Sequence, residues 1–408
     1  MDFRYTSDEQ MFKDAFEKWL NSHVPEGFGG PGYEPPAGWD EKAEEYRRFQ
    51  RDLFDAGYAG INFPKRYGGA EGGVMENIIV SELTGPVYFH AMGGCHVISL
   101  GLAAPTILAW GNPVQKEEFL PRTLSGEIIW SQGFSEPNAG SDLANLGTRA
   151  FKDGGEYIVN GQKIWSSFAH IADWGILVCR TDPTVAKHKG LSYFLVDLTL
   201  PGIEIRPIMN IAGDPEFNEI FFEDVRIPEA MRVGDEGDGW KVALTTLGHE
   251  RHLGEVAMAS TFFKEYAELV ESVKRLALNG QSASKDPLVR QRLAQIYVEL
   301  SVMRCNGYRN MSKLAKGDVP GPEGSVGKLF WSELHQRMTE VAVDILGPYH
   351  QLTGDSKYTI ANGQWGFHFL RAKGNTIEQG TSEIQKNIIG ERVLGLPKDT
   401  ARIGKKGN

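Results

Sequence analysis

The densest group of residues able to do chemistry is His249-Glu250-Arg251-His252. Two imidazoles and a carboxylate are the ligands and the base of a helical zinc site, whose motif is H-E-x-x-H. That motif requires histidines four residues apart, whereas His249 and His252 are three apart. The sequence therefore predicts no metal site here.

Nucleotide-binding and hydrolase motifs are also missing. Gly321 to Lys328 approaches a phosphate-binding loop, but five residues separate its outer glycines and Leu329 follows the lysine, so we interpret it as the start of a helix. Neither a G-x-G-x-x-G turn between a strand and a helix nor a G-x-S-x-G elbow occurs. These absences exclude the usual nicotinamide, nucleotide and serine-hydrolase sites.

Three other segments combine hydroxyl, aromatic, glycine and amide residues in a recognisable order. They are Gln132-Gly-Phe-Ser-Glu-Pro-Asn-Ala-Gly-Ser-Asp142, Asn160-Gly-Gln-Lys-Ile-Trp-Ser-Ser-Phe168 and Asn375-Thr-Ile-Glu-Gln-Gly-Thr-Ser-Glu-Ile-Gln385. They resemble the T-E-P-x-A-G-S-D, N-G-x-K-x-W-I-T-N and Y-E-G-T-x-x-I-Q motifs of the acyl-CoA dehydrogenase family. Residues 111–127, 223–228 and 391–395 resemble further family motifs. The resemblance covers nearly the whole chain.

The resemblance implies an FAD enzyme that removes two hydrogens from an acyl thioester. A carboxylate takes a proton from the carbon next to the carbonyl, flavin N5 takes a hydride from the next carbon, and a trans-2-enoyl-CoA forms. By this resemblance Ser135 and Ser167 lie beside the flavin ring, Trp165 packs against it, and Ser141 lies near the thioester end of the substrate. Taken singly, Ser135 is also compatible with a turn hydroxyl and Trp165 with a core aromatic.

The C-terminal motif is expected to stabilise the negative charge that develops on the thioester oxygen. In the family a backbone N–H of this segment bonds that oxygen, and the matching N–H is that of Gln379. Gly380 would let the backbone approach closely, and Thr381 would contact FAD.

The catalytic base is where the sequence departs from many family members. They carry Glu at the position of Gln379, which cannot accept a proton as a carboxylate does. Isovaleryl-, long-chain- and steroid-type members place the base on the first long helix of the C-terminal domain, followed by Arg. We therefore assign Glu250 as the base and Arg251 as a substrate contact; the alternative is a solvated helix face.

The dinucleotide half of the FAD site also departs from the family. Its R-x-x-F-G turn is absent, and Arg290, or less favourably Arg275, is the candidate for the pyrophosphate. A Q-x-x-G-G-x-G turn is reduced to one glycine, Gly347. Phe168 stands where Asn is usual beside the flavin ring.

The elements that must position these residues change type along the chain. Helical spacing, as in Asp40–Ala56, prevails to about residue 130, short strands follow to about 240, and long helices return. Trp174–Arg180 is one predicted strand, and Asp153-Gly154-Gly155 predicts a hairpin. The predicted fold is multidomain α+β: an N-terminal helical domain (1–130), a middle β-barrel or β-sandwich domain (131–240) and a C-terminal four-helix bundle (241–408).

Composition limits the partners of the chain. The 408 residues carry 43 Lys and Arg against 53 Asp and Glu, a net charge of −10 that disfavours nucleic acid and anionic membranes. Three scattered cysteines predict a reducing, cytoplasmic setting. Ala91–Trp110 is nearly all small or apolar, and its proline and glycines favour a buried helix over a membrane span.

The leading hypothesis is an acyl-CoA dehydrogenase of lipid catabolism and β-oxidation that passes electrons to an electron-transfer flavoprotein. We expect a homotetramer or heterotetramer, and a bulky, branched or ring-bearing acyl group. A FAD-holding partner subunit without a complete active site, or a flavin oxidase or monooxygenase on the same fold, are the alternatives. A carboxylate at Glu250 favours catalysis over the partner-subunit reading.

Overall fold

The computed structural model describes residues 5–28, 36–250, 254–278, 280–317, 321–354 and 356–398. The chain divides into two compact units, Met1–Glu265 (unit 1) and Tyr266–Asn408 (unit 2). Helix α7 (Gly254–Arg275) begins in unit 1 and ends in unit 2. Across the described ranges, none of the helices has both the length and the apolar character that crossing a membrane requires.

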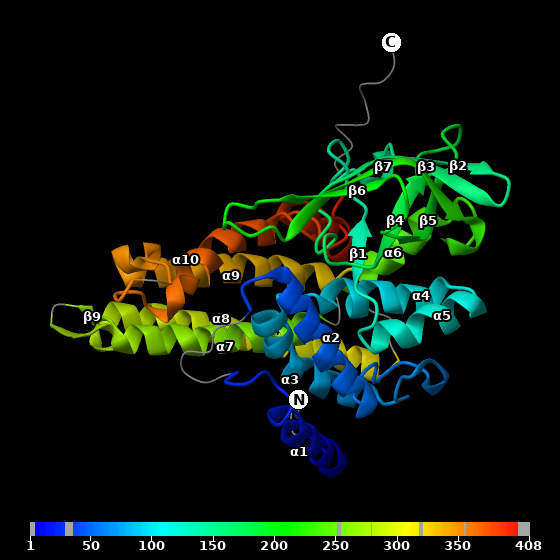
Figure 1. Cartoon of the computed structure of the whole chain (residues 1–408). Coiled ribbons are helices and arrows are strands. Elements are labelled where there is room, and N and C mark those ends of the chain that lie inside the picture. Colours follow the sequence, from blue (N-terminus) through cyan, green and yellow to red (C-terminus); the bar gives the residue numbers. More distant parts are fainter. Residues whose placement is uncertain are drawn as a thin grey trace. The chain divides into compact units, whose positions relative to one another are not determined.

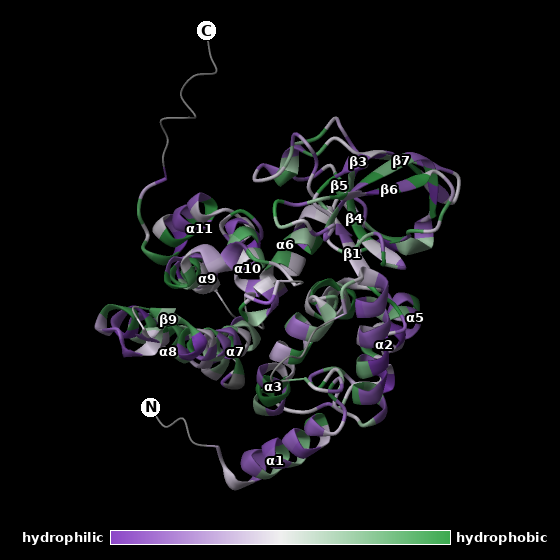
Figure 2. Cartoon of the chain, turned by 60° about the vertical axis from the view of Figure 1, so that its left-hand side comes forward, coloured by the Kyte–Doolittle hydropathy of each residue, from purple (hydrophilic) through white to green (hydrophobic). Residues whose placement is uncertain are grey.

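Unit 1 opens with helices that each bury one face. They are α1 (Ser7–Asn21), α2 (Trp39–Asp55), α3 (Val74–Met92), α4 (Ala104–Trp110) and α5 (Pro113–Leu124). Hydrophilic and hydrophobic residues alternate around α1 and α2, as helical spacing requires (Figure 2). α2 buries Tyr46, Phe49 and Leu53 on one face, so the helix predicted for Asp40–Ala56 is confirmed.

The apolar stretch Ala91–Trp110 is buried in unit 1, as predicted, but it is not one regular helix. α3 ends at Met92, and Gly93 ends the helix in a left-handed conformation (φ 59°). A π-helical segment (Val97–Ala103) then leads into α4. The hydroxyl of Ser99 accepts the Trp130 N–H at 3.0 Å, which ties this segment to the first strand.

The strands of unit 1 form one eight-stranded sheet in the order β6-β7-β3-β2-β4-β5-β8, with β1 paired in parallel to β4 (Figure 1). They are β1 (Trp130–Gly133), β2 (Arg149–Asp153), β3 (Glu156–Lys163), β4 (Trp174–Arg180), β5 (Leu191–Asp197), β6 (Ile203–Ile208), β7 (Phe217–Pro228) and β8 (Arg232–Val233). The predicted hairpin joins β2 to β3, where Asp153 pairs with Glu156. The middle domain is β-rich as predicted, but its described strands branch at β4 and do not close into a barrel.

Helix α6 (Gly239–Glu250) follows the sheet and completes the core of unit 1. The Thr246 hydroxyl on α6 lies 3.0 Å from that of Thr106 on α4 and 3.2 Å from that of Tyr193 on β5. α6 is therefore fixed against both the helices and the sheet.

Unit 2 contains the end of α7 and helices α8 (Pro287–Ala315), α9 (Gly324–Leu346), α10 (Gln364–Arg371) and α11 (Ser382–Ile388) (Figure 1). A short hairpin, β9 (Ala277–Leu278) and β10 (Gln281–Ser282), connects α7 to α8. α9 contacts α8, α10 and α11 and so forms the centre of the unit. Because Gly324 to Lys328 begin α9, the interpretation of that glycine-rich segment as a helix start is confirmed.

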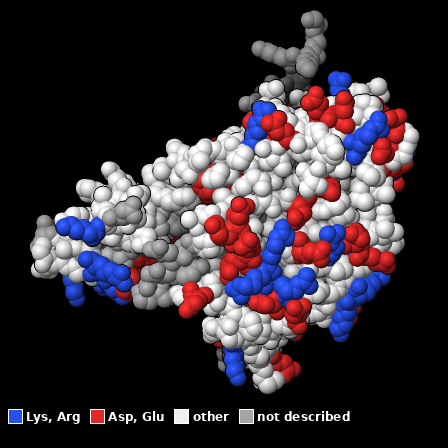
Figure 3. Space-filling model, in the orientation of Figure 1, with Lys and Arg blue, Asp and Glu red and all other residues white. Residues whose placement is uncertain are grey.

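Charges are mixed on the face drawn in Figure 3, where Lys and Arg lie among Asp and Glu. Arg122, for example, pairs with Glu118 at 2.9 Å and with Glu127 at 2.6 Å. Such a face offers no broad positive field of the kind that attracts nucleic acid.

Candidate active site

The chain at the end of β1 and just after it meets the residues that follow β3, which brings the first two motif segments together. The Ser131 hydroxyl donates to the Ser167 carbonyl at 2.8 Å, and the Ile164 N–H donates to the Ser135 carbonyl at 2.9 Å. Ser135 and Ser167, predicted to serve one site, therefore lie on adjacent segments of unit 1, and both are partly exposed.

A buried ion pair fixes the loop that follows β1. Lys163 is fully buried at the end of β3, and its Nζ donates to the Phe134 carbonyl at 3.0 Å and to Glu136 Oε1 at 2.8 Å. The Glu136 carboxylate also accepts the N–H groups of Gly147 and Thr148. Burial opposes ionisation of Glu136, but Lys163 and these hydrogen bonds outweigh it and lower the pKa of the carboxyl.

Trp165 is presented to solvent. Its side chain is 57% exposed, its φ is 62°, and its ring meets Phe217 edge-on at 6.0 Å between centroids. A non-glycine residue held at positive φ with an exposed indole is unusual for a core aromatic. Phe168, by contrast, is buried against Trp39 at 5.2 Å and belongs to the core.

Two polar side-chain atoms on these segments have no hydrogen-bond partner among the described residues. Among the described residues, Gln132 Nε2 and Ser166 Oγ are buried without a hydrogen-bond partner. Buried polar atoms are nearly always paired, so two unpaired ones on adjacent segments indicate a place where a polar ligand binds.

The third motif segment forms a tight turn in unit 2. Gln379 has φ 56° and Gly380 has φ 86°, both in the left-handed region. Thr381 then caps α11, its hydroxyl accepting the Ile384 N–H at 3.3 Å. From α11 the side-chain amide of Gln385 donates back to the Gln379 carbonyl at 2.8 Å and to that of Gly380 at 3.3 Å.

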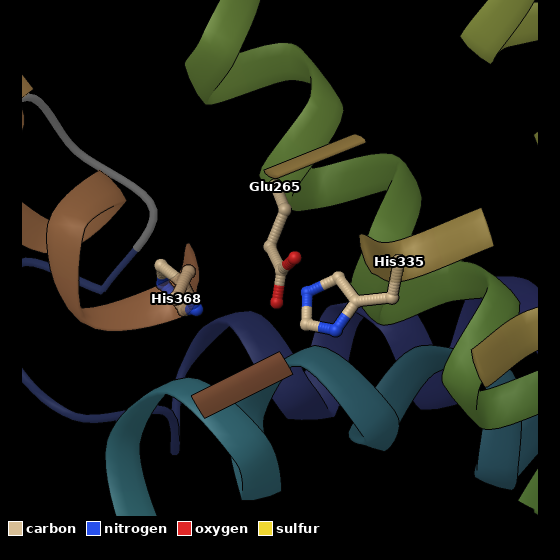
Figure 4. Close-up of side chains that lie close together, drawn as sticks. All are labelled: Glu265, His335 and His368. Carbon is tan, nitrogen blue, oxygen red and sulfur yellow. The ribbon is translucent and has the colours of Figure 1, made fainter. Parts of the chain in front are cut away.

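The residues before this turn are held by polar side chains of α9 and α10. Lys328, buried near the start of α9, donates to the Asn375 carbonyl at 2.7 Å, and the Asn375 side-chain amide lies 2.7 Å from His335 Nδ1. Figure 4 draws His335 with His368 and Glu265; the two imidazole centroids are 6.3 Å apart. The segment that carries Gln379 is therefore a fixed part of unit 2.

The ends of α8 and α9 also meet in unit 2. Arg292 on α8 pairs with Asp344 on α9 at 2.7 Å, so the first turns of α8 lie beside the last turn of α9. Arg290 is exposed in the first turn of α8, and Gly347 ends α9 with φ 55°. These two predicted residues thus lie at the same end of the unit.

All three domains of one family match this chain: the N-terminal domain over residues 6–127, the middle domain over 131–225 and the C-terminal domain over 237–394 of acyl-CoA dehydrogenase. The chain belongs to the acyl-CoA dehydrogenase family. It is 37% identical to acyl-CoA dehydrogenase IpdE1 of Mycobacterium tuberculosis (strain ATCC 25618 / H37Rv) over 400 residues, which span 96% of this chain and 99% of that protein.

Solved structures agree with this assignment. The Tcur3481-Tcur3483 steroid ACAD has a TM-score of 0.83 at 27% identity, over 98% of this chain and all of that one. The ChsE4-ChsE5 complex from Mycobacterium tuberculosis has a TM-score of 0.83 at 29% identity, again over 98% of this chain and all of that one. This protein is an acyl-CoA dehydrogenase, an oxidoreductase that acts on the CH–CH group of acyl-CoA thioesters, and its relatives favour neither alternative function.

Family members are flavoproteins, and the residues of this acyl-CoA dehydrogenase fit a flavin. An exposed indole offers a flat apolar surface to a ring system. The unpaired Gln132 Nε2 and Ser166 Oγ and the partly exposed hydroxyls of Ser135 and Ser167 offer donors and acceptors to the polar edge of that ring. Ser141 is exposed at the end of the same loop.

The carboxylate next to Gln379 already forms an ion pair. Glu378, next to Gln379, forms an ion pair with Arg371 at 3.0 Å. Glu250 is the last residue of α6, one turn after Thr246; its side chain and the whole of Arg251 lie outside the described residues.

Three residues that sequence reasoning did not single out fix the motif segments within their own units: Glu136 and Lys163 in unit 1, and Gln385 in unit 2. Each belongs to a quoted motif, so the signal was available. A lysine at the end of β3 and an acid three positions after β1 could have indicated a buried pair, whereas Gln385 offered only its motif position.

Proposed function

We propose that this acyl-CoA dehydrogenase binds FAD and uses Glu250 as its base. The observation that carries the FAD proposal is the exposed Trp165 ring beside the unpaired, buried Gln132 Nε2 and Ser166 Oγ. FAD, when bound, would accept the hydride that leaves the second carbon from the thioester carbonyl, next to the carbon that loses the proton. The side chains of Ser135, Trp165 and Ser167 orient its ring and exclude water from one face.

The proton is proposed to move from the carbon next to the carbonyl to the Glu250 carboxylate. Two arguments support Glu250 over neighbours of the C-terminal turn. Gln379 carries an uncharged amide that is not a base, and Glu378 is neutralised by Arg371. As the proton leaves, negative charge develops on the thioester oxygen, and the Gln379 backbone N–H stabilises it.

The remaining residues bind the two anionic molecules. We assign Gly380 and Thr381 to FAD, Arg290 and Gly347 to its dinucleotide half, and Ser141 with Arg251 to the acyl-CoA. The proposed domains are 1–130, 131–240 and 241–408, a division supported by the ranges that the family models match.

For the substrate we propose a bulky, branched or ring-bearing acyl group, and for the acceptor an electron-transfer flavoprotein. Similarity to a steroid ACAD supports the ring-bearing choice. The resemblance to a complex of two proteins, ChsE4-ChsE5, supports an assembly of more than one chain, and we propose a homotetramer or heterotetramer.

The test is an anaerobic titration of the flavin-loaded protein with butyryl-, isovaleryl-, octanoyl-, palmitoyl- and 3-cyclohexylpropanoyl-CoA, following flavin absorbance. We expect bleaching, fastest with the branched or ring-bearing compounds. Glu250→Gln should slow bleaching about 10²- to 10⁴-fold. Glu271→Gln, which changes an exposed acid paired with Lys274 on α7, is the matched control and should bleach normally. Bleaching by no thioester would refute the function, and normal bleaching of Glu250→Gln would refute the base.

A further inference from the structure

Gln385 is a fully buried polar residue that the proposed chemistry does not use. It lies in the first half of α11, and its side chain turns back onto the residues that precede the helix. One amide nitrogen, Nε2, reaches two successive carbonyls, those of Gln379 at 2.8 Å and Gly380 at 3.3 Å. The contact is close-fitting, because a Cβ added to Gly380 would lie 2.8 Å from this nitrogen.

The oxygen of the Gln385 amide shows that the NH₂ group sets how this side chain is oriented. Gln385 Oε1 is buried and has no partner among the described residues. A buried acceptor without a donor is unfavourable, and an apolar side chain of similar volume would avoid it. The two carbonyls can only be served by the NH₂ group, so the orientation of the amide is set by its donors.

The same turn fixes the direction of the Gln379 N–H. Each peptide group is planar, so a held carbonyl also fixes the N–H of the next residue, and Gln385 thus fixes the N–H groups of Gly380 and Thr381. The peptide group that carries the Gln379 N–H lies between these held groups and the held Glu378 N–H, so its direction is set through both neighbours. Gln385 holds the peptide groups after Gln379 and after Gly380, while the Glu378 N–H donates to the Gly374 carbonyl at 3.0 Å before them. Gln379 joins these anchored segments at φ 56°, and its N–H donates to no carbonyl or side chain within the described ranges.

We propose that Gln385 is a positioning residue for acyl-CoA dehydrogenation, because its amide clamps the Gln379 and Gly380 carbonyls and thereby aims the Gln379 N–H at the thioester oxygen of the substrate. This inference rests on the function proposed above. The clamp does not touch the substrate; it acts through the backbone of the turn, whose left-handed residues would otherwise relax.

The experiment compares Gln385→Met with Gln115→Met in the flavin-loaded protein. Gln115 is a matched control: it is buried, and its Nε2 donates to the carbonyls of Ala230 and Arg232 at 2.8 and 3.0 Å. Both changes remove two amide-to-carbonyl hydrogen bonds, and Gln115→Met also removes the bond that Gln115 Oε1 accepts from the Asn112 N–H at 3.0 Å, so the control perturbs the fold at least as much. Gln385→Asn, which keeps a buried amide but withdraws it by one methylene, is the second variant should the Met variant fold poorly.

The first readout is amide hydrogen exchange without substrate, in peptides that cover residues 374–383. We expect exchange there to become about tenfold faster in Gln385→Met and Gln385→Asn and to stay unchanged in Gln115→Met. Equal protection of this segment in all variants would overturn the clamp.

The second readout is the carbonyl stretch of a bound 2-enoyl-CoA labelled with ¹³C at the carbonyl, prepared from the acyl-CoA that bleaches the wild type fastest. A donated hydrogen bond lowers this frequency, so we expect the band to move back toward that of the free thioester in the Gln385 variants, with kcat reduced about 10- to 100-fold. An unshifted band, or equal kcat losses in Gln115→Met and Gln385→Met, would show a purely structural role. A wild type that neither bleaches nor shifts the carbonyl band refutes the proposed function itself, whereas hydrogen exchange still reports on the clamp.

Discussion

Replacing Lys163 by methionine should destabilise unit 1 strongly, because it leaves the Glu136 carboxylate without its cation. Lys163 is fully buried, and its Nζ joins the end of β3 to Glu136 and to the Phe134 carbonyl. Methionine fills a similar volume without the charge. The change therefore tests the ion pair with little effect on packing.

The magnitude follows from what remains around Glu136. Removing one partner of a buried ion pair typically costs about 3–5 kcal/mol. The Glu136 side chain is 11% exposed and keeps the N–H groups of Gly147 and Thr148, so we expect about 3 kcal/mol, at the lower end of that range. For a unit of this size that corresponds to a fall in Tm of about 6–12 °C.

The assay is calorimetric unfolding with FAD in equal excess in every sample. Lys152→Met is the control: Lys152 pairs with Glu229 at 2.6 Å, but both side chains are well exposed, and no measurable change is expected. The double variant Lys163→Met/Glu136→Gln should recover part of the loss, since no charge is stranded. A fall in Tm no greater than that of Lys152→Met would refute the reasoning.

The same ion pair gives a pH dependence whose sign can be worked out. The pKa of Glu136 is lowered in the fold from its usual 4.5, so unfolded chains bind the proton first as the pH falls. The stability that Glu136 contributes is present above pH 4.5 and is lost below it, as the pH falls through the folded pKa. In Lys163→Met the folded pKa of Glu136 should rise, so this loss of stability in acid should be smaller than in the wild type.

Three further predictions concern other residues. Burial lowers the pKa of His96 from 6.5 to about 3, so the free energy of unfolding should decrease from pH 6.5 toward pH 3, by about 2 kcal/mol at pH 5. In urea unfolding, His96→Phe should remove this pH dependence. An unchanged pH dependence would contradict the assignment. Trp165→Ala should weaken FAD binding about tenfold, measured by flavin fluorescence, without changing Tm, since the ring is exposed. Arg290→Ala should weaken binding of FAD about tenfold but not that of FMN, which lacks the pyrophosphate; equal effects on both would exclude Arg290 from the dinucleotide half.

Local signals in the sequence predicted the elements well where turn chemistry and periodicity agree. Trp174–Arg180 has the same bounds as β4, and the Asp153-Gly154-Gly155 turn joins β2 to β3 as expected. The secondary structure of Ala91–Trp110 was not predictable in detail, because Gly93 ends α3 and the chain continues as a π-helix. Composition predicts that such a stretch is buried, but not where its helix breaks. Of the two alternatives for the middle domain, the barrel is not what the described strands form. Strand order depends on contacts between residues far apart in the sequence, so local patterns could not decide between a barrel and an open sheet.

The sequence motifs predict which residues face the flavin, but not the buried contacts that hold those residues in place. Trp165 was predicted to contact a ligand, and its exposure agrees with that role, since a core indole would be buried. Lys163 ends β3, two residues before Trp165, yet lysine in a strand is usually solvated. Its burial depends on the loop that brings Glu136 back over β3, and this is a tertiary contact that no local pattern encodes.

The side chains of the C-terminal turn support our proposal that the base comes from elsewhere in the chain. At φ 56° Gln379 offers the substrate a backbone N–H, and its side chain is neutral. Glu378 is adjacent, but moving it to the substrate would break its 3.0 Å pair with Arg371 and disturb the turn that Gln385 holds from the other side. In this turn residue 379 is a neutral amide and Glu378 is ion-paired, so neither side chain is suited to accept the proton. The chemistry of this turn therefore supports our proposal that the Gln379 N–H stabilises charge on the thioester oxygen while Glu250 accepts the proton.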